Sequence, residues 1–383
     1  MKKLWSSIFD LAKSQKNLAS VGVADFTGVA LSAVFWFYLA SLTEADKFGE
    51  VHYFIGIAGI AYTISLVGTQ NSITVFTAKN LKIESTLFFM SLIAGTIAAI
   101  ILLIIFHRFD VTLLLFGYII NDLSIAYLLG QKLYKNYSKY IVLQKSLNLC
   151  LGLGFFYLFG MQGILFALAI SYMHFLIIIY KGFRNSKVDF SIVKSKSNFI
   201  IYNYVYSLTG GFRGNIDRIL IAPLLGFTVL GNYAIALQFV SVLMIFSSVS
   251  YKYLLAQDAS GGLNLRLKKW IIILSIIISL LGIILLPKII PFIFPKYTNV
   301  IEAIQIMSLS VIPATLTLIF TSKLLGSEKS KFVLISAVIN VIVETIGIIL
   351  FGHTLGIVGV AISYVLGATS TTIFLIICSK LLK

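Results

Sequence analysis

Long, uninterrupted apolar runs constrain this chain more than any other feature of its sequence. A helix needs about 20 apolar residues to cross the roughly 30 Å hydrocarbon core of a bilayer. Runs of that length recur from one end of the chain to the other, and only 11% of the residues are charged. The runs lack the alternation of apolar and polar residues that a transmembrane β-barrel requires. The sequence therefore predicts an all-α integral membrane protein.

Scanning with a window of that length predicts about twelve membrane-spanning helices. Residues 1–17 precede them and place apolar side chains on one helical face, which predicts a short amphipathic segment at the cytoplasmic interface. The expected spans are 18–41, 51–76, 85–106, 111–130, 141–159, 163–180, 199–222, 230–255, 270–286, 300–322, 332–351 and 357–379.

The positions of the positive charges predict the orientation. Most lysines and arginines fall in alternate loops, whereas the opposite side has only Lys47, Arg108, Lys288 and Lys296. Cytoplasmic loops carry such an excess of positive charge. Both termini and the central loop are therefore expected in the cytoplasm, in a multi-pass protein of the inner cell membrane. This arrangement accounts for the net charge of +16 without a nucleic-acid partner.

The chain divides into two halves of six predicted spans each. A basic stretch, 181–198, separates residues 18–180 from residues 199–383 and is expected to be a cytoplasmic linker. Asn148 and Tyr172 recur 192 residues later as Asn340 and Tyr364, and 39–49 aligns without a gap with 221–231. Because each half has an even number of spans, the repeats are parallel. We expect two six-helix bundles in a V shape around a central cavity, the plan of a transporter.

The sequence contains none of the common enzymatic motifs that would indicate another class of protein. The sequence has no nucleotide-binding P-loop, no serine nucleophile elbow and no H-E-x-x-H motif. The four histidines are scattered over separate spans or loops, so neither a metal site nor a cofactor is expected. A membrane-embedded polysaccharide polymerase or ligase remains an alternative, although such an enzyme is expected to carry a large outer loop.

Ionisable residues inside the predicted spans are the candidates for function, because a charge at membrane depth costs about 2.5–3.5 kcal/mol on insertion scales. Arg213 and Asp217 are four residues apart and therefore share a helix face. Two readings stay open: the arginines Arg213 and Arg218 bind a phosphate group in the cavity, or Arg213 forms a buried pair with Asp217. Gly210, Gly211 and Gly214 permit a helix break or a close helix approach nearby. The other candidates, for cavity lining or ion coupling, are Asp25, Asp122, Asp217, Glu344 and Asn203.

Several stretches resemble a known family in their order along the chain. The segment DRILIAPLLGFTVLGNYAIALQF (217–239) opens the second half with an Asp-Arg pair followed by Leu-Gly-x-Tyr. PFIFPKYTNVIEAIQIMSLSVIP (291–313), AVINVIV (337–343) and GIVGVAISY (356–364) follow. In these features the chain is similar to the Wzx-type O-antigen and capsular polysaccharide flippases of the multidrug/oligosaccharidyl-lipid/polysaccharide exporter superfamily, which includes the MATE transporters.

The resemblance implies a transporter that moves a polyprenyl-pyrophosphate-linked oligosaccharide from the inner to the outer leaflet by alternating access. It maps Asp217 and Arg218 onto the family's Asp-Arg pair, with Arg213 one turn earlier. It further implies a glycan–lipid substrate, and it leaves open whether an ion, H⁺ or Na⁺, is coupled and whether a polysaccharide polymerase or glycosyltransferases associate with the chain. A MATE-like cation or drug antiporter is the alternative within transporters.

Overall fold

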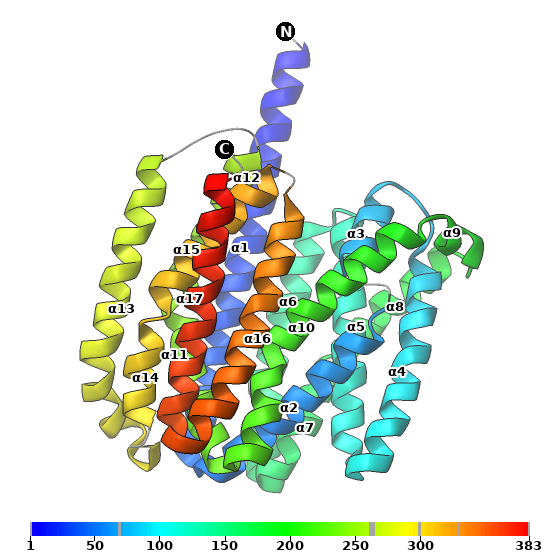
Figure 1. The fold of residues 1–383 in the computed structure, drawn as a ribbon. Helices are drawn as coiled ribbons and strands as arrows, with labels where there is room; N and C mark the ends of the chain where they lie inside the picture. The colour runs from blue at the N-terminus through cyan, green and yellow to red at the C-terminus, as the bar shows by residue number, and fades with distance from the viewer. Residues whose placement is uncertain (1, 68–69, 260–264, 298–299, 328, 382–383) are drawn as a thin grey trace. The chain divides into compact units, whose positions relative to one another are not determined.

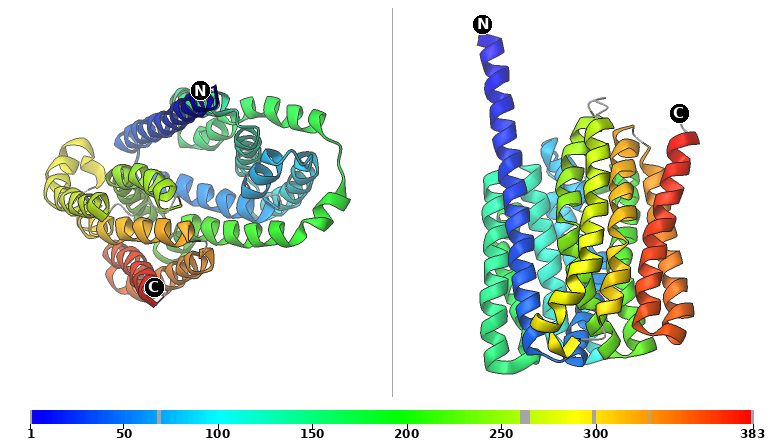
Figure 2. Two further views of the ribbon diagram at one scale, coloured as in Figure 1. Left: turned by 90° about the horizontal axis from the view of Figure 1, so that it is seen from above. Right: turned by 90° about the vertical axis from the view of Figure 1, so that its left-hand side faces the viewer.

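The computed structural model describes residues 2–67, 70–259, 265–297, 300–327 and 329–381, and in these ranges the chain is helical with no strand (Figures 1 and 2). The first helices are α1 Lys2–Leu42, α2 Ala45–Ser65, α3 Gln70–Ala78, α4 Glu84–Phe106, α5 Phe109–Gly130, α6 Tyr134–Phe159, α7 Gly163–Ser171, α8 Leu176–Asn185 and α9 Phe190–Ser195. They are followed by α10 Ser197–Leu225, α11 Phe227–Leu243, α12 Ile245–Ala259, α13 Leu265–Ile293, α14 Val300–Ser308, α15 Val311–Gly326, α16 Ser330–Leu355 and α17 Ile357–Leu381. Short 3₁₀ turns lie at η1 Gly160–Gln162, η2 Met173–Phe175 and η3 Pro295–Tyr297.

The helices account for the predicted spans. Eight segments of the described chain are long and apolar enough to cross a membrane, and two bent helix pairs, α2–α3 and α11–α12, raise this number to ten. One of the eight, Tyr134–Asn185, reverses at Gly160 and so supplies two spans. α10 carries three charges and coincides with the predicted span 199–222. The predicted all-α membrane fold is therefore confirmed, and the chain is a multi-pass membrane protein.

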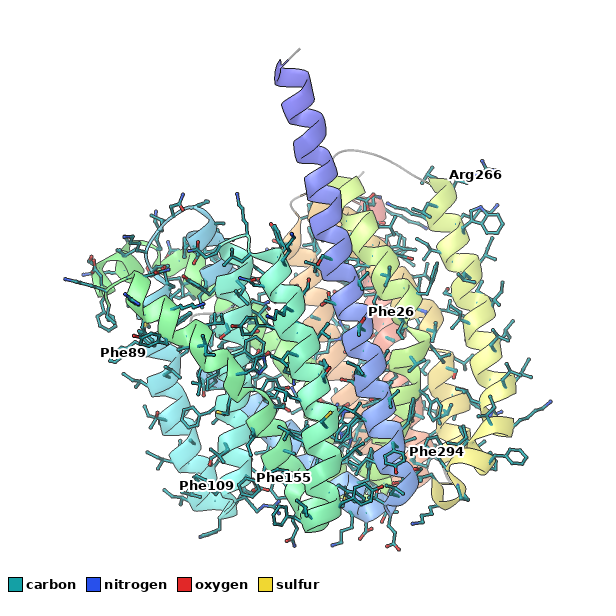
Figure 3. The ribbon with its side chains drawn as sticks, turned by 180° about the vertical axis from the view of Figure 1, so that it is seen from behind. Phe26, Phe89, Phe109, Phe155, Arg266 and Phe294 are labelled. Carbon is teal, nitrogen blue, oxygen red and sulfur yellow. The ribbon has the colours of Figure 1, made fainter. Side chains whose placement is uncertain are left out.

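Apolar side chains cover the outside of these helices. Along α4, Ile100 and Ile104 are 53% and 67% exposed, and Leu280 and Ile284 of α13 are about as exposed. Figure 3 shows side chains such as Phe109 on the outside of their helices. A soluble protein rarely exposes apolar patches of this extent, whereas in a bilayer these side chains face lipid.

The chain forms two compact units that do not follow its order strictly. The first consists of Met1–Phe35 and Ala58–Leu208, and the second of Trp36–Ile57 and Thr209–Lys383. The end of α1 and the first half of α2 thus belong to the unit that otherwise contains the second half of the chain. The sequence division at 181–198 remains a prediction about the membrane bundles. Residues 2–17, predicted as a separate interfacial segment, are helical and continuous with the first span in α1.

The same helical hairpin occurs in both halves and supports the internal repeat. α6 turns into α7 at Gly160, and α16 turns into α17 at Gly356, both with positive φ. In each hairpin a second glycine follows three residues later, and a methyl group there would overlap a phenylalanine carbonyl oxygen, that of Phe155 or of Phe351. Only glycine allows this approach. The hairpins are therefore equivalent elements.

The predicted linker is attached to the first unit. The Ser85 hydroxyl at the start of α4 contacts the carbonyl oxygens of Gly182 and Ser186, at 3.1 and 2.9 Å. The Thr86 hydroxyl accepts the backbone N–H of Asp189 at 2.8 Å. The Asp189 carboxylate then accepts hydrogen bonds from Ser191 and caps α9, and these bonds lower the pKa of Asp189. The basic stretch between the halves is thus an ordered connection.

Two glycines of α6 provide a matched test of this packing. A side chain at Gly152 would overlap the buried ring of Phe35, whereas Gly154 faces open space. We expect Gly152→Ala to lower the free energy of unfolding by about 1–3 kcal/mol through overpacking. Gly154→Ala is expected to change it little or to raise it by up to about 1 kcal/mol, because alanine favours helix. Thermal unfolding of the two purified variants in detergent measures the difference; equal melting temperatures would contradict this packing.

Candidate functional site

The charged residues of α10 lie on an unbroken helix of the second unit. α10 continues through Gly210 and Gly214, and no atom of a neighbouring element lies within 4 Å of the Cβ position of either. The predicted break or close helix approach at these two glycines is therefore wrong. The helix ends before Gly226, whose φ of 89° is accessible to glycine at little cost.

Asp217 is buried and already has hydrogen-bond donors. Its side chain is 5% exposed, and its Oδ2 accepts the hydroxyl of Tyr233 from α11 at 2.7 Å. Its Oδ1 accepts the backbone N–H of Arg218 at 2.8 Å. Both oxygens of the carboxylate are thus satisfied by neutral donors, as a buried polar group requires.

Glu344 of α16 is another buried carboxyl group of this unit. It is 5% exposed and lies 3.5 Å from the Tyr233 hydroxyl. A phenol has a single proton to donate, and the shorter contact shows that Asp217 receives it. A side chain at Gly367 of α17 would meet Asn340 Nδ2 at 3.0 Å and Glu344 Cβ at 3.2 Å, so α17 packs closely beside Glu344. Asp217 and Glu344 therefore lie on either side of one hydroxyl group, that of Tyr233; we call these two residues the carboxyl pair.

The predicted ion pair between Arg213 and Asp217 is not formed. Among the described residues, no carboxylate oxygen lies within 4.0 Å of Arg213, although the two residues share a helix face. The Arg213 side chain is exposed, and Glu344 lies within its electrostatic range. Hydrogen bonds from neutral donors do not cancel the charge of a carboxyl group, so Asp217 still interacts electrostatically with Arg218, and Glu344 with Arg213, although neither carboxyl group forms a close ion pair with Arg213.

Arg218 packs against the first half of α2. A side chain at Gly56 would meet the Arg218 Cβ at 3.0 Å, so the glycine makes room for the arginine stem. The Arg218 Nε is buried and has no hydrogen-bond partner. One turn earlier on α2, His52 is 5% exposed, and both of its ring nitrogens also lack partners. Its ring packs on Trp36 at 4.7 Å. Buried polar atoms without a hydrogen-bond partner cost about 1–3 kcal/mol each. The Nε of Arg218 and the ring nitrogens of His52 are therefore available to a hydrogen-bonding partner.

The remaining candidates lie in the first unit and do not gather in one place. Asp25 of α1 accepts the Tyr137 hydroxyl from α6 at 2.7 Å. Asp122 of α5 lies beside Tyr62 and has one buried oxygen without a partner. Asn203 donates to the Phe199 carbonyl of its own helix at 2.9 Å. These contacts anchor Asp25 and Asn203 locally, whereas Asp122 keeps an unused acceptor.

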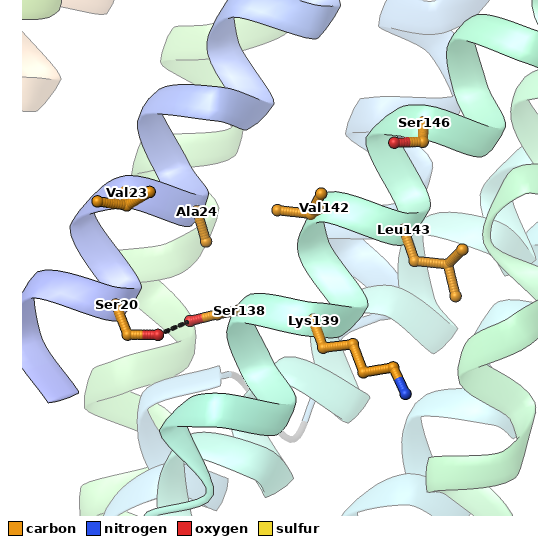
Figure 4. Close-up of a pocket in the computed structure, with 8 residues that line it drawn as sticks. All are labelled: Ser20, Val23, Ala24, Ser138, Lys139, Val142, Leu143 and Ser146. Atoms are coloured by element: carbon orange, nitrogen blue, oxygen red, sulfur yellow. Dashed lines mark hydrogen bonds between the residues drawn. The ribbon is translucent and has the colours of Figure 1, made fainter.

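A groove of about 700 Å³ runs between α1 and α6 in the same unit (Figure 4). The Ser20 and Ser138 hydroxyls meet across the helices at 2.9 Å, and the Lys139 side chain extends at the groove. The residues that line it are Ser20, Val23, Ala24, Ser138, Lys139, Val142, Leu143 and Ser146.

Two residues of the second unit were not among the sequence candidates. Tyr233 is the tyrosine of the Leu-Gly-x-Tyr motif, which marked the family resemblance but did not indicate that its hydroxyl binds Asp217. His52 lies in an apolar run, and the only sequence feature that singles it out is that a histidine is rare in such a run.

The comparisons with known proteins show the fold. No family model and no curated protein matches the chain in sequence. Among solved structures, the lipid II flippase MurJ in an inward closed conformation is similar with a TM-score of 0.75 and 12% identity, over 94% of this chain and 87% of that one. A multidrug resistance MATE family transporter in an inward-facing conformation is similar with a TM-score of 0.72 and 16% identity, over 93% and 94%. The Vibrio cholerae MATE transporter VcmN, in a mutant form, has a TM-score of 0.64 at 12% identity, over 96% of both chains. The chain therefore has the fold of the MATE transporters and of MurJ.

The hydroxyl that connects the carboxyl pair provides a test of the site. We expect Tyr233→Phe to lower the free energy of unfolding by about 1–3 kcal/mol, because the mutation leaves an oxygen of Asp217 buried without a donor. Tyr364→Phe is the matched control, since the Tyr364 ring lies 6.5 Å from that of Tyr233 and no contact of its hydroxyl holds Asp217. Thermal unfolding in detergent measures both, and equal losses would show that the hydroxyl has no such role.

Proposed function

We propose that the chain is a flippase that moves a polyprenyl-pyrophosphate-linked oligosaccharide from the inner to the outer leaflet by alternating access. One observation carries the proposal: among the described residues, neither Arg213 nor Arg218 of the membrane-spanning helix α10 has a carboxylate oxygen within 4.0 Å, and the buried Nε of Arg218 has no hydrogen-bond partner. An ionisable residue inside a membrane-spanning helix is a candidate functional site by default.

The chemistry of the substrate fits this site. A pyrophosphate cannot enter hydrocarbon unaided, because burying its charges without partners is costly. Arginine guanidinium groups bind phosphate oxygens through paired hydrogen bonds. The exposed side chain of Arg213 and the unused Nε of Arg218 supply such donors. The prenyl tail can stay in lipid, and the fold, which is also that of a lipid II flippase, is compatible with such a path.

Export is not driven by nucleotide hydrolysis in this proposal, since the sequence has no nucleotide-binding motif. An inside-negative potential favours the outward movement of an anionic head by about 2.3 kcal/mol per charge per 100 mV. We assign coupling to the carboxyl pair, in which Asp217 accepts the Tyr233 hydroxyl and Glu344 lies 3.5 Å from the same oxygen. Two carboxyl groups so close together favour the uptake of one cation, H⁺ or Na⁺. Association with a polysaccharide polymerase or glycosyltransferases at the inner membrane belongs to the same proposal.

A cation or drug antiporter is the second candidate, and one cluster of the first unit favours it. Asp122 has an unused oxygen, and Tyr62 beside it begins a row of rings, with Tyr118 at 5.8 Å and Tyr172 at 5.6 Å from Tyr118. Carboxylates and aromatic faces both attract organic cations. The two arginines of α10 repel such a substrate, and for that reason the flippase is the first choice.

Flipping by purified protein in liposomes tests the arginines. A fluorescent polyprenyl-pyrophosphate oligosaccharide is placed in the inner leaflet, and its arrival in the outer leaflet is measured. We expect Arg213→Gln with Arg218→Gln to reduce the rate by at least about tenfold, because each lost charged hydrogen bond is worth about 1.5–3 kcal/mol. Arg184→Gln, at an exposed arginine of α8, is the control and should leave the rate unchanged.

Two results would contradict the proposal. One is wild-type flipping by a double mutant whose melting temperature is unaltered. The other is the efflux of cationic dyes by the wild-type protein with no flipping. Efflux that is then lost in Asp122→Asn would assign the chain to the antiporters.

The carboxyl pair makes a separate prediction about coupling. We expect Glu344→Gln to slow flipping and to remove its dependence on an imposed pH or Na⁺ gradient, because the neutral amide cannot take up a cation as the carboxylate does. The same liposomes, with and without each gradient, provide the measurement. Unchanged gradient dependence in this variant would exclude Glu344 from coupling, and Asp25→Asn would then be measured in the same way.

A further inference from the structure

The groove between α1 and α6 lies beside a parallel pair of helices in the first unit. Near the start of α6 the Ser20 and Ser138 hydroxyls meet at 2.9 Å, and farther along both helices Gly152 lies against the ring of Phe35. Residue numbers thus rise in the same direction on the two helices. The groove of about 700 Å³ extends along them from the serine contact to Ser146 (Figure 4).

The walls of the groove are apolar and open to the outside of the helices. Val23 and Ala24 of α1 and Val142 and Leu143 of α6 line it. Val23 is 66% exposed and Leu143 is exposed as well, so a molecule can enter from the side. From Ser138 to Ser146 the wall is about 12 Å long, which is most of the depth of one leaflet in a hydrocarbon core of about 30 Å. A hydrocarbon chain of a membrane lipid matches these dimensions.

Positive charge stands at one end of the groove. Lys139 is one of the lining residues, and its side chain extends toward the start of α6 (Figure 4). Lys135 lies one turn earlier and is exposed. Among the described residues, no carboxylate oxygen lies within 4.0 Å of either lysine. Asp25 of the same helix pair is not a lining residue and accepts the Tyr137 hydroxyl. The charged end is the one that the positive-inside rule places toward the cytoplasm.

We propose that the groove binds an anionic phospholipid, with an acyl chain between α1 and α6 and the phosphate at Lys139 and Lys135. The groove presents apolar walls and positive charge in the order in which a phospholipid carries its chain and its phosphate. Anionic lipids are a component of the cytoplasmic leaflet, and basic pockets between membrane helices on that side bind their head groups. This lipid site does not depend on which substrate the protein transports.

The bound lipid stabilises the position of α1. This helix contributes to both compact units, because its residues up to Phe35 belong to the first and those from Trp36 onward belong to the second. A chain in the groove adds contacts to Val23 and Ala24 and holds this part of α1 on α6. Since the site exists only in the folded protein, an anionic phospholipid raises the melting temperature.

Photo-crosslinking locates the lipid. The purified protein is placed in phosphatidylcholine nanodiscs with a trace of phosphatidylglycerol that carries a diazirine in one acyl chain, and crosslinked peptides are identified by mass spectrometry. We expect crosslinks within 20–24 and 138–146. Lys135→Gln with Lys139→Gln should reduce them at least about tenfold, because a lysine near the membrane surface strengthens the binding of an anionic lipid by about fivefold. Lys181→Gln, at an exposed lysine of α8 in the same unit, is the control and should leave them unchanged.

A second variant tests the groove itself while keeping both lysines. Val142→Phe places a ring between α1 and α6, so it should remove the crosslinks and the rise in melting temperature that phosphatidylglycerol gives in detergent. Leu158→Phe is the matched control, since Leu158 is 74% exposed on the same helix and does not line the groove. If Val142→Phe does not fold, the lysine variants alone decide.

Three results would overturn the lipid site. One is wild-type crosslinking in the folded double lysine variant. The second is equal crosslinking by a phosphatidylcholine probe with the same diazirine, which would make the groove an ordinary lipid-facing surface. The third is displacement of the probe by farnesyl pyrophosphate and not by unlabelled phosphatidylglycerol, which would assign the groove to a prenyl chain.

Discussion

The short hydrogen bond from Tyr233 to Asp217 determines the electrostatics of the second unit. Together with the backbone N–H of Arg218, it supplies a donor to each oxygen of the buried carboxyl group. Asp217 therefore needs no close contact with an arginine, and the Nε of Arg218 has no hydrogen-bond partner. Glu344 lies 3.5 Å from the same hydroxyl, so one phenol positions two carboxyl groups beside the arginines of α10.

Glycine determines how closely the helices approach. In a membrane there is no hydrophobic force between helices, so small residues that admit close contact become the main source of packing energy. Here glycines seat Phe35 on α6, admit the stem of Arg218 beside α2 and fold the two equivalent hairpins at Gly160 and Gly356. The same principle applies where α2 meets α11, because Gly49 and Gly231 there lie against backbone carbonyl groups.

Hydropathy alone was enough to predict the membrane fold, because span length is a physical requirement of the bilayer and does not depend on partners. The repeat could also be predicted, from residues such as Asn148 and Asn340. The contacts of the charged groups could not be predicted from the sequence. Helical spacing placed Arg213 near Asp217, but the pairing was decided by Tyr233, sixteen residues later on another helix. Likewise, the spacing of Gly210 and Gly214 drew attention to α10, whereas glycines with close contacts lie on other helices, among them α2, α5, α6 and α11.

The assignment of Trp36–Ile57 to the second unit has a consequence for biosynthesis. These residues are translated long before Thr209–Lys383, with which they pack. The nascent chain therefore carries the end of α1 and the start of α2 without their final neighbours while the whole of Ala58–Leu208 is made. The insertion machinery or lipid has to shield them in the meantime. A gene cut at the central linker would yield two fragments, neither of which contains a complete folding unit.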